Sequence, residues 1–219
     1  MAEAFITTQA GGLDIIPNPA LKPEASYSYE IGIGQFIGEN ILADAAVFQS
    51  DFTDLIEPRF VTVAGILKGQ FNNVTSARIQ GVELSVKSGF FDKSLFLDVG
   101  YTYVYPRDLT LNDILKYRPR HVFYAGVLAH TGFFRAGVDF RYISKIERID
   151  EEFKLFVNDA DERSPIYVID VRLGADLERA GIPLSLAFNI NNIFQYNYVE
   201  LIGNIMPPRS YTLAAEVTL

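Results

Sequence analysis

Apolar and polar residues alternate with a period of two along most of the chain, and a helical period is difficult to find. In the clearest segment, Phe134 to Tyr142, the even positions are apolar and the odd positions carry two arginines, a glycine and an aspartate. Only a β-strand places two such sets on opposite faces. The same pattern predicts about ten strands, at 27–33, 40–52, 60–64, 82–86, 95–103, 121–130, 134–142, 167–177, 184–191 and 210–219.

The connections between these segments are alternately short and long. Short ones, rich in Gly, Asp and Lys, lie at 37–39, 89–93, 131–132 and 178–182 and are typical of tight hairpin turns. Long ones lie at 53–73, 106–119, 144–165 and 192–208. Outer-membrane barrels have this arrangement, with short periplasmic turns and long extracellular loops. The chain is therefore predicted to be all-β, an antiparallel up-and-down transmembrane barrel; a soluble β-sandwich also alternates and remains the other interpretation.

The free-energy cost of exposing a charge to lipid indicates which face of each strand points to the lumen. An Arg or Lys facing lipid at mid-depth costs about 2–4 kcal/mol, so the charged positions of each strand are expected to face the lumen. Tyrosines near strand ends fit membrane interfaces, which favour them. The lumen-facing candidates for ligand contact are Glu83, Arg135, Asp139, Arg141, Asp170 and Arg172.

Composition excludes several kinds of chemistry. There is no Cys, and therefore no disulfide, thiol nucleophile or thiolate metal site. The net charge of −8 argues against a nucleic-acid partner. His121 and His130 are nine residues apart on one predicted strand, so they are expected to face opposite ways and cannot share a metal. No nucleophile elbow or zinc-protease motif is present. We expect no enzyme activity, no cofactor and no metal site.

The segment 147–163 is acidic, with seven carboxylates against three basic residues. The expected interpretation is a solvated external loop. A calcium site, or a metal that bridges lipopolysaccharide, is the alternative.

Short motifs are spread over nearly the whole chain. They are Asn18 to Glu24 with Tyr29 to Gly32, Ala46 to Ile56, Phe71 to Leu84, Tyr101 to Tyr103, Arg118 to His121, Asn189 to Phe194 and Pro208 to Tyr211. Each motif is weak alone, but in this order and spacing they resemble the C-terminal half of a TonB-dependent outer-membrane receptor. The terminal Leu219 departs from the Phe that ends many outer-membrane proteins, and Met206 stands where the family usually has a small or polar residue.

The resemblance implies a receptor in the bacterial outer membrane that imports a scarce nutrient, such as a ferric siderophore, haem, cobalamin or a glycan, with energy from the TonB complex. Such receptors have barrels of about 22 strands around an N-terminal plug. Residues 1–219 are therefore expected to be a C-terminal fragment of the barrel, an open sheet without transport activity of its own. Met1 to Gly12 does not read as a signal peptide. Implied partners are outer-membrane lipid and lipopolysaccharide, TonB through the absent plug, the small-molecule ligand, and the barrel-assembly machinery through the last strand.

Two further interpretations concern single residues. Gly81 and Gly100 are expected to face the lumen where a side chain would crowd a neighbour, and Glu30 and Glu83 to pair with lumen arginines or a plug. A self-contained small barrel, acting as a channel, adhesin or membrane hydrolase, is the alternative to the fragment.

Overall fold

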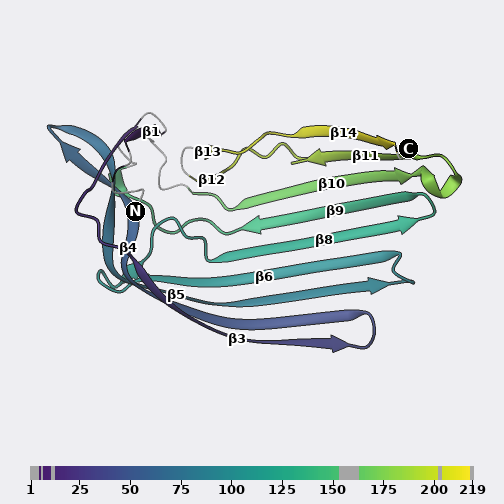
Figure 1. The fold of residues 1–219 in the computed structure, drawn as a ribbon, viewed down its shortest axis with the longest axis horizontal. Helices are drawn as coiled ribbons and strands as arrows, with labels where there is room; N and C mark the ends of the chain where they lie inside the picture. Colours follow the sequence, from purple (N-terminus) through teal and green to yellow (C-terminus); the bar gives the residue numbers. More distant parts are fainter. Residues whose placement is uncertain (1–4, 6, 11–12, 153–162, 202–203, 218–219) are drawn as a thin grey trace.

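The computed structural model describes residues 5, 7–10, 13–152, 163–201 and 204–217. These residues form one 12-stranded sheet and a separate two-stranded ribbon. In Figure 1 the long strands lie side by side, with tight turns at one end of the sheet and the long connections at the other. The described part is all-β apart from 3₁₀ turns at 151–152 and Leu177–Ala180, and none of its helices is long and apolar enough to cross a membrane.

Nine strands of eight residues or more form the wall of the sheet. They are β3 (Ala25–Ile37), β4 (Ile41–Val63), β5 (Ile66–Phe90), β6 (Leu95–Asp108), β8 (His121–Thr131), β9 (Phe134–Ile143), β10 (Ile166–Asp176), β11 (Leu184–Asn191) and β14 (Ser210–Val217). Five short strands lie in the connections: β1 (Thr8–Ala10), β2 (Leu13–Ile16), β7 (Asp113–Ile114), β12 (Val199–Leu201) and β13 (Asn204–Ile205). Each wall strand pairs antiparallel with its neighbour in the chain, which confirms the predicted up-and-down order.

The predicted long loop 53–73 is wrong, because β4 and β5 run through it as one extended hairpin. Its tip lies at Ala64 and Gly65, both with positive φ, and the separate strand expected at 60–64 is the end of β4. Asp54 has a positive φ of 53° and interrupts the pairing without changing its register, and Pro58 looked incompatible with a strand. Pro58 is tolerated because β3 pairs with β4 only as far as Thr53, which leaves β4 an edge strand above that point. The described part of the chain therefore has nine wall strands where the sequence predicted ten.

The short turns lie where they were predicted, at one end of the sheet. Gly38 and Gly132 have φ of 63° and 54°, a conformation that glycine adopts without strain. The turn after β10 is the 3₁₀ helix η3 (Leu177–Ala180), capped by Gly181 in the left-handed region. At the other end, β2 pairs parallel with the upper part of β5, so residues 13–16 lie beside the extended hairpin.

Among the described strands, β3 pairs only with β4 and β14 only with β11, so the sheet is open as predicted. One face, which we call the inner face, carries Asp139, Arg141 and Arg172. The opposite outer face carries exposed apolar residues such as Val138, Tyr167 and Leu173. The expected separation of charged and apolar sets is confirmed.

The inner face is the crowded one. A Cβ added to Gly81 would clash with the Tyr103 carbonyl oxygen and lie 2.6 Å from Cζ of Phe48, as the sequence predicted. The prediction is wrong for Gly100, where a Cβ would have no neighbour within 4 Å. In the described part of the chain, small buried clusters lie at the long-loop end, around Leu115 and around Val168.

Candidate functional site

Strand pairing brings most of the sequence-predicted site residues together on the inner face of β9 and β10. Asp139 of β9 lies opposite Asp170 of β10, and Arg141 lies opposite Val168. Arg172 lies opposite Gly137, one inward position along from Asp170. Glu83 is on β5, three strands away from β9, and is not part of this group.

Asp139 is the centre of the first group. Its carboxylate accepts from Arg172 at 2.8 Å through both Nε and Nη2, and from the Tyr124 hydroxyl of β8 at 2.9 Å. The absence of a side chain at Gly126 leaves room for this triad, because a Cβ there would lie 2.5 Å from the Tyr124 oxygen and 3.0 Å from Oδ1 of Asp139. The triad joins three strands on a half-exposed surface, so it orients Arg172 more than it stabilises the fold.

Arg141 holds the described residues of the loop between β11 and β14, 192–201 and 204–209, against the inner face. Its guanidinium donates to the Tyr198 hydroxyl at 3.0 Å and forms a 3.0 Å ion pair with Glu200. Tyr198 is buried at 9% exposure and packs with Ile166 and Val168, which are inward residues of β10. The predicted long external loop therefore folds inward at its described residues.

Asp170 fixes the start of the same loop. Its carboxylate accepts from the Asn192 backbone N–H at 2.6 Å, and the buried Asn192 side chain accepts from the Tyr196 N–H and donates to the Tyr196 carbonyl, both at 2.8 Å. The Tyr196 hydroxyl then donates to the Pro165 carbonyl before β10. Two of the six predicted residues, Arg141 and Asp170, thus position a loop.

Arg135 and Glu83 differ from the other four. Arg135 lies flat across Gly174, whose Cβ would be 2.7 Å from Cγ of Arg135. Glu83 is exposed and, like Glu30, forms no ion pair with the described residues, so of the two expected partners the arginines are not found and a plug stays a prediction. Glu83, Glu30 and Asp44 line an inner-face hollow of about 500 Å³ over β3 to β8. A second hollow of similar size, lined by Lys87, Asp98 and Arg172, adjoins it at Tyr124.

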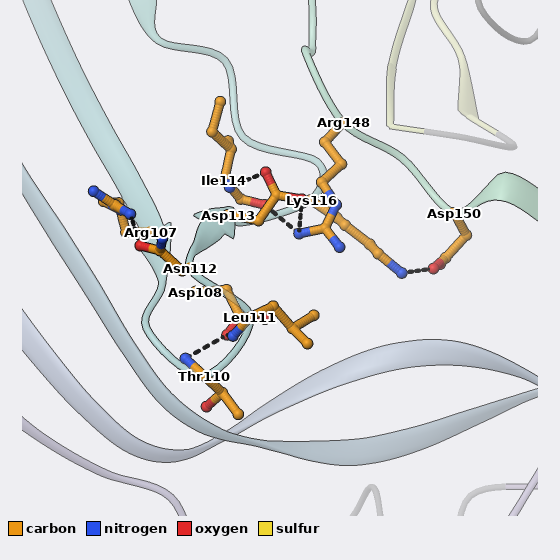
Figure 2. A network of polar contacts seen from close by, with 10 residues as sticks. All are labelled: Arg107, Asp108, Thr110, Leu111, Asn112, Asp113, Ile114, Lys116, Arg148 and Asp150. Carbon is orange, nitrogen blue, oxygen red and sulfur yellow. Dashed lines mark hydrogen bonds and ion pairs between the residues drawn. The ribbon is translucent and has the colours of Figure 1, made fainter.

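A second polar group joins the loops after β6 and β9, also at the long-loop end of the sheet (Figure 2). Asp150 is 3% exposed; it forms an ion pair with Lys116 and accepts from the Tyr117 hydroxyl at 2.5 Å. Arg148 pairs with Asp113 at 3.2 Å and donates to the Ile114 carbonyl. These contacts therefore link the loop after β6 to the loop after β9.

The same group is anchored to the extended hairpin. Arg118 donates to the buried Glu57 of β4 at 3.0 Å, and Leu115 packs against Leu55 and Val74 of the hairpin. Burial raises the pKa of Glu57, and this effect exceeds the opposing one of the Arg118, Lys116 and Arg59 charges. Burial and the Asp150 carboxylate also raise the pKa of the Tyr117 phenol.

The acidic segment was expected to be solvated, and for Asp150 this is wrong because the side chain is buried in that network. Glu147 pairs with Arg120 at 2.8 Å. Asp159, Asp161 and Glu162 lie outside the described residues, and in the described part no group of three His, Asp or Glu residues is placed to hold a metal ion. His121 and His130 lie on opposite faces of β8 as predicted: His121 accepts from or donates to the Tyr101 hydroxyl, whereas His130 lies beside Phe96.

Sequence reasoning missed Tyr198, Glu200, Asn192 and Lys116. Tyr198, Asn192 and Lys116 lie in irregular segments, and Glu200 lies in the three-residue strand β12, which is too short for a period to predict a facing direction. The only available signal was the Asn191-Asn192 pair that closes β11, because Asn commonly hydrogen-bonds its own backbone nearby.

The sequence was compared with known families, and residues 2–193 match the model of the TonB dependent receptor-like β-barrel. The chain belongs to the TonB-dependent receptor family. Family members are outer-membrane β-barrel proteins, which places this receptor chain in the bacterial outer membrane, and they are transport receptors rather than enzymes. No curated protein matched the sequence.

Solved structures similar to this receptor chain share its fold at low sequence identity. The copper transporter OprC superposes with a TM-score of 0.71 at 18% identity over 90% of this chain and 32% of its own. The ferric-catecholate import receptor Fiu of E. coli K12 gives 0.65 at 22% identity over 89% and 28%. A ferric enterobactin receptor variant from Pseudomonas aeruginosa, in complex with enterobactin, gives 0.65 at 18% identity over 93% and 32%. The chain spans about a third of the length of these proteins.

Proposed function

We propose that residues 1–219 form the C-terminal portion of the barrel of a receptor for TonB-energised uptake of a scarce nutrient. The observation that carries the proposal is the family match over residues 2–193, together with an open sheet that spans about a third of the matched transporters. On this proposal the remaining barrel strands and the plug, which contacts TonB, belong to a preceding part of the receptor.

The proposed ligand is a ferric siderophore, haem, cobalamin or a glycan. The charged inner face supports a wall that contacts the ligand over one that has only a structural role. Arg172 and Arg135 present guanidinium groups there, and Arg172 is held in place by Asp139. Guanidinium groups bind carboxylate and other oxyanion groups in a fixed geometry, which suits an anionic ligand that passes along the inner face. The Arg141 site supports the same function indirectly, because it sets how far the β11–β14 loop extends over that face.

Complementation in a receptor-null strain tests the proposal. A gene that supplies this chain together with a plug and the remaining strands should restore uptake of the ligand, measured with a radiolabelled ferric siderophore as the first probe. This chain expressed alone should reach the membrane fraction and restore none. Uptake by the chain alone, or uptake that continues without TonB, would contradict the proposal.

A further inference from the structure

The Glu200 carboxylate lies beside Arg141 on the inner face, but the alignment of the two groups is poor. Oε1 of Glu200 is 3.0 Å from Nη1 of Arg141. This oxygen is buried, yet it forms no well-aligned hydrogen bond with the described residues. The strongest arginine–carboxylate pairs have two parallel hydrogen bonds from the guanidinium to the carboxylate. A carboxylate with better alignment would therefore bind Arg141 in preference to Glu200.

The Arg141–Glu200 ion pair is not the main anchor of the β11–β14 loop. Asn192 donates its backbone N–H to Asp170 at the start of the loop, and Tyr198 packs in a buried cluster with residues of β10. The side chains of Arg141 and Glu200 are 39% and 30% exposed, so solvent screens their attraction. Glu200 can therefore separate from Arg141 while Asn192 and Tyr198 keep their contacts.

The Tyr198 hydroxyl is a second donor beside Arg141. It accepts a hydrogen bond from Nη2 of Arg141 at 3.0 Å, and a phenol that accepts one hydrogen bond can also donate one. Burial raises the pKa of Tyr198, so the phenol keeps its proton at neutral pH. The guanidinium and the phenol therefore lie side by side, and both can donate to one carboxylate.

The charges on the inner face of β9 and β10 balance only when Glu200 is included. The group has three positive and three negative side chains: Arg135, Arg141, Arg172, Asp139, Asp170 and Glu200. Departure of Glu200 leaves three positive charges against two negative ones, a net charge of +1. An incoming carboxylate restores the balance, so the electrostatics of this group favour exchange of one carboxylate for another.

Two further arginines follow Arg141 along the inner face towards the turn end. The strand register places Arg172 two inward rows beyond Arg141, and Arg135 one row beyond Arg172. Each row advances about 7 Å along a strand. Arg172 is oriented by Asp139, and Arg135 lies across Gly174. A carboxylate that leaves Arg141 in this direction therefore approaches another guanidinium.

We propose that Arg141 and Tyr198 bind a carboxylate of the imported ligand in competition with Glu200. Glu200 occupies Arg141 in the absence of ligand and is displaced by a carboxylate that aligns better with the guanidinium. The ligand group is assigned as a carboxylate because the position already accommodates one. Among the proposed ligands, this selects nutrients with free carboxylates. The inference rests on the proposed function and adds to it a ligand class and an internal competitor.

The test measures binding of citrate, a simple tricarboxylate probe, to the complete receptor with its plug and remaining strands, by calorimetry in detergent. Glu200→Gln removes the competing charge and should raise the citrate affinity about fivefold, because a half-exposed ion pair contributes up to about 1 kcal/mol. Arg141→Gln should lower the affinity below that of the unaltered receptor. The double variant should bind like Arg141→Gln alone, since Glu200 then has no guanidinium to occupy.

Glu216→Gln is the matched control for loss of one negative charge. Glu216 is exposed on β14 opposite Ser185, near the turn end, and its substitution should leave the citrate affinity unchanged. Trimethyl citrate, which has the same skeleton without the charges, should not bind to Glu200→Gln. Heat-modifiable migration on gels shows that each variant is folded.

Three results would overturn the proposal: equal citrate affinity in Glu200→Gln and the unaltered receptor, a similar gain in Glu216→Gln, or no measurable citrate binding by Glu200→Gln. Uptake of a radiolabelled ferric siderophore by the unaltered receptor tests the proposed function separately. Uptake that proceeds while Glu200→Gln fails to change citrate binding would contradict this inference alone.

Discussion

Arg141 and Tyr198 are 57 residues apart in the sequence, yet the guanidinium of the first donates a 3.0 Å hydrogen bond to the hydroxyl of the second. Arg141 projects from the inner face of β9, and Tyr198 lies in the β11–β14 loop. This contact decides that the loop lies on the inner face and does not extend away from the sheet. The loop therefore narrows the space through which a ligand would move.

Removal of that contact should release the loop. Tyr198→Phe keeps the ring and its packing but deletes the hydroxyl, and a hydrogen bond to a charged group contributes about 1.5–3 kcal/mol. We expect faster proteolysis within residues 192–201 in the folded receptor, measured as the cleavage rate by a protease of broad specificity. Tyr211→Phe, on the exposed outer face, is the control and should cleave like the unaltered protein. Unchanged protection in Tyr198→Phe would show that packing alone holds the loop.

Loss of the buried Asp150 carboxylate should destabilise the external loops far more than loss of the exposed Asp113. Asp150→Ala leaves Lys116 without its partner in a buried network, which typically costs about 3 kcal/mol. Asp113→Ala breaks a half-exposed pair with Arg148 and should cost less than about 1 kcal/mol. Hydrogen exchange of residues 109–120 and 144–152 measures both effects. Similar exchange in the two variants would contradict the assigned burial.

Gly81 and Gly100 should respond oppositely to Ala substitution. At Gly81 a Cβ would meet the Tyr103 backbone and the Phe48 ring, so we expect Gly81→Ala to cost about 1–3 kcal/mol through overpacking. At Gly100 the space is open, and Gly100→Ala should be neutral or slightly stabilising because alanine restricts the unfolded chain. Urea unfolding in detergent, followed by tyrosine fluorescence, compares the two. An unchanged free energy of unfolding in Gly81→Ala would mean that β6 can move away from the added methyl group without cost.

The Glu57 carboxyl should make the receptor less stable as the pH rises from acid to neutral. Burial raises the pKa of Glu57 in the folded state, so the folded protein retains a proton there that the unfolded chain has already lost. The stabilising contribution of Glu57 is complete below the ordinary carboxyl pKa and is lost as the pH rises through the raised pKa of the folded state. The melting temperature of the receptor minus that of Glu57→Gln should therefore fall as the pH rises between these two pKa values. A difference that rises with pH would mean that the Arg118 ion pair outweighs burial.

The Tyr117 phenol should resist ionisation by alkali. Burial, together with the hydrogen bond to Asp150, raises the pKa of the Tyr117 phenol above its usual value. The phenol therefore contributes fully to stability below the usual pKa, and this contribution is lost as the pH rises through the raised pKa. Ultraviolet titration of the receptor minus that of Tyr117→Phe isolates this one phenol. We expect its absorbance change to come after that of the exposed tyrosines. Ionisation together with them would contradict the buried placement.

The sequence by itself determined the direction in which most wall residues face. Period-two alternation placed Asp139, Arg141 and Arg172 on one face, and the cost of exposing charge to lipid assigned that face to the lumen. The short turns, the antiparallel order, the open edges and the family were also predictable. Each depends on residues close together in the chain, such as Gly132 in a two-residue turn, or on motifs whose order is itself sequence information.

Only the tertiary structure decided what the long connections do. Residues 53–73 continue as strands because β4 and β5 keep one register above the wall, although Pro58 and the positive φ of Asp54 are unusual in a strand. Asp150 is buried because Lys116 and Tyr117 reach it from another loop, and Arg141 meets Tyr198 from a strand two removed from the loop's own. Such contacts depend on distance in space between irregular segments, and no periodicity within a segment carries that information.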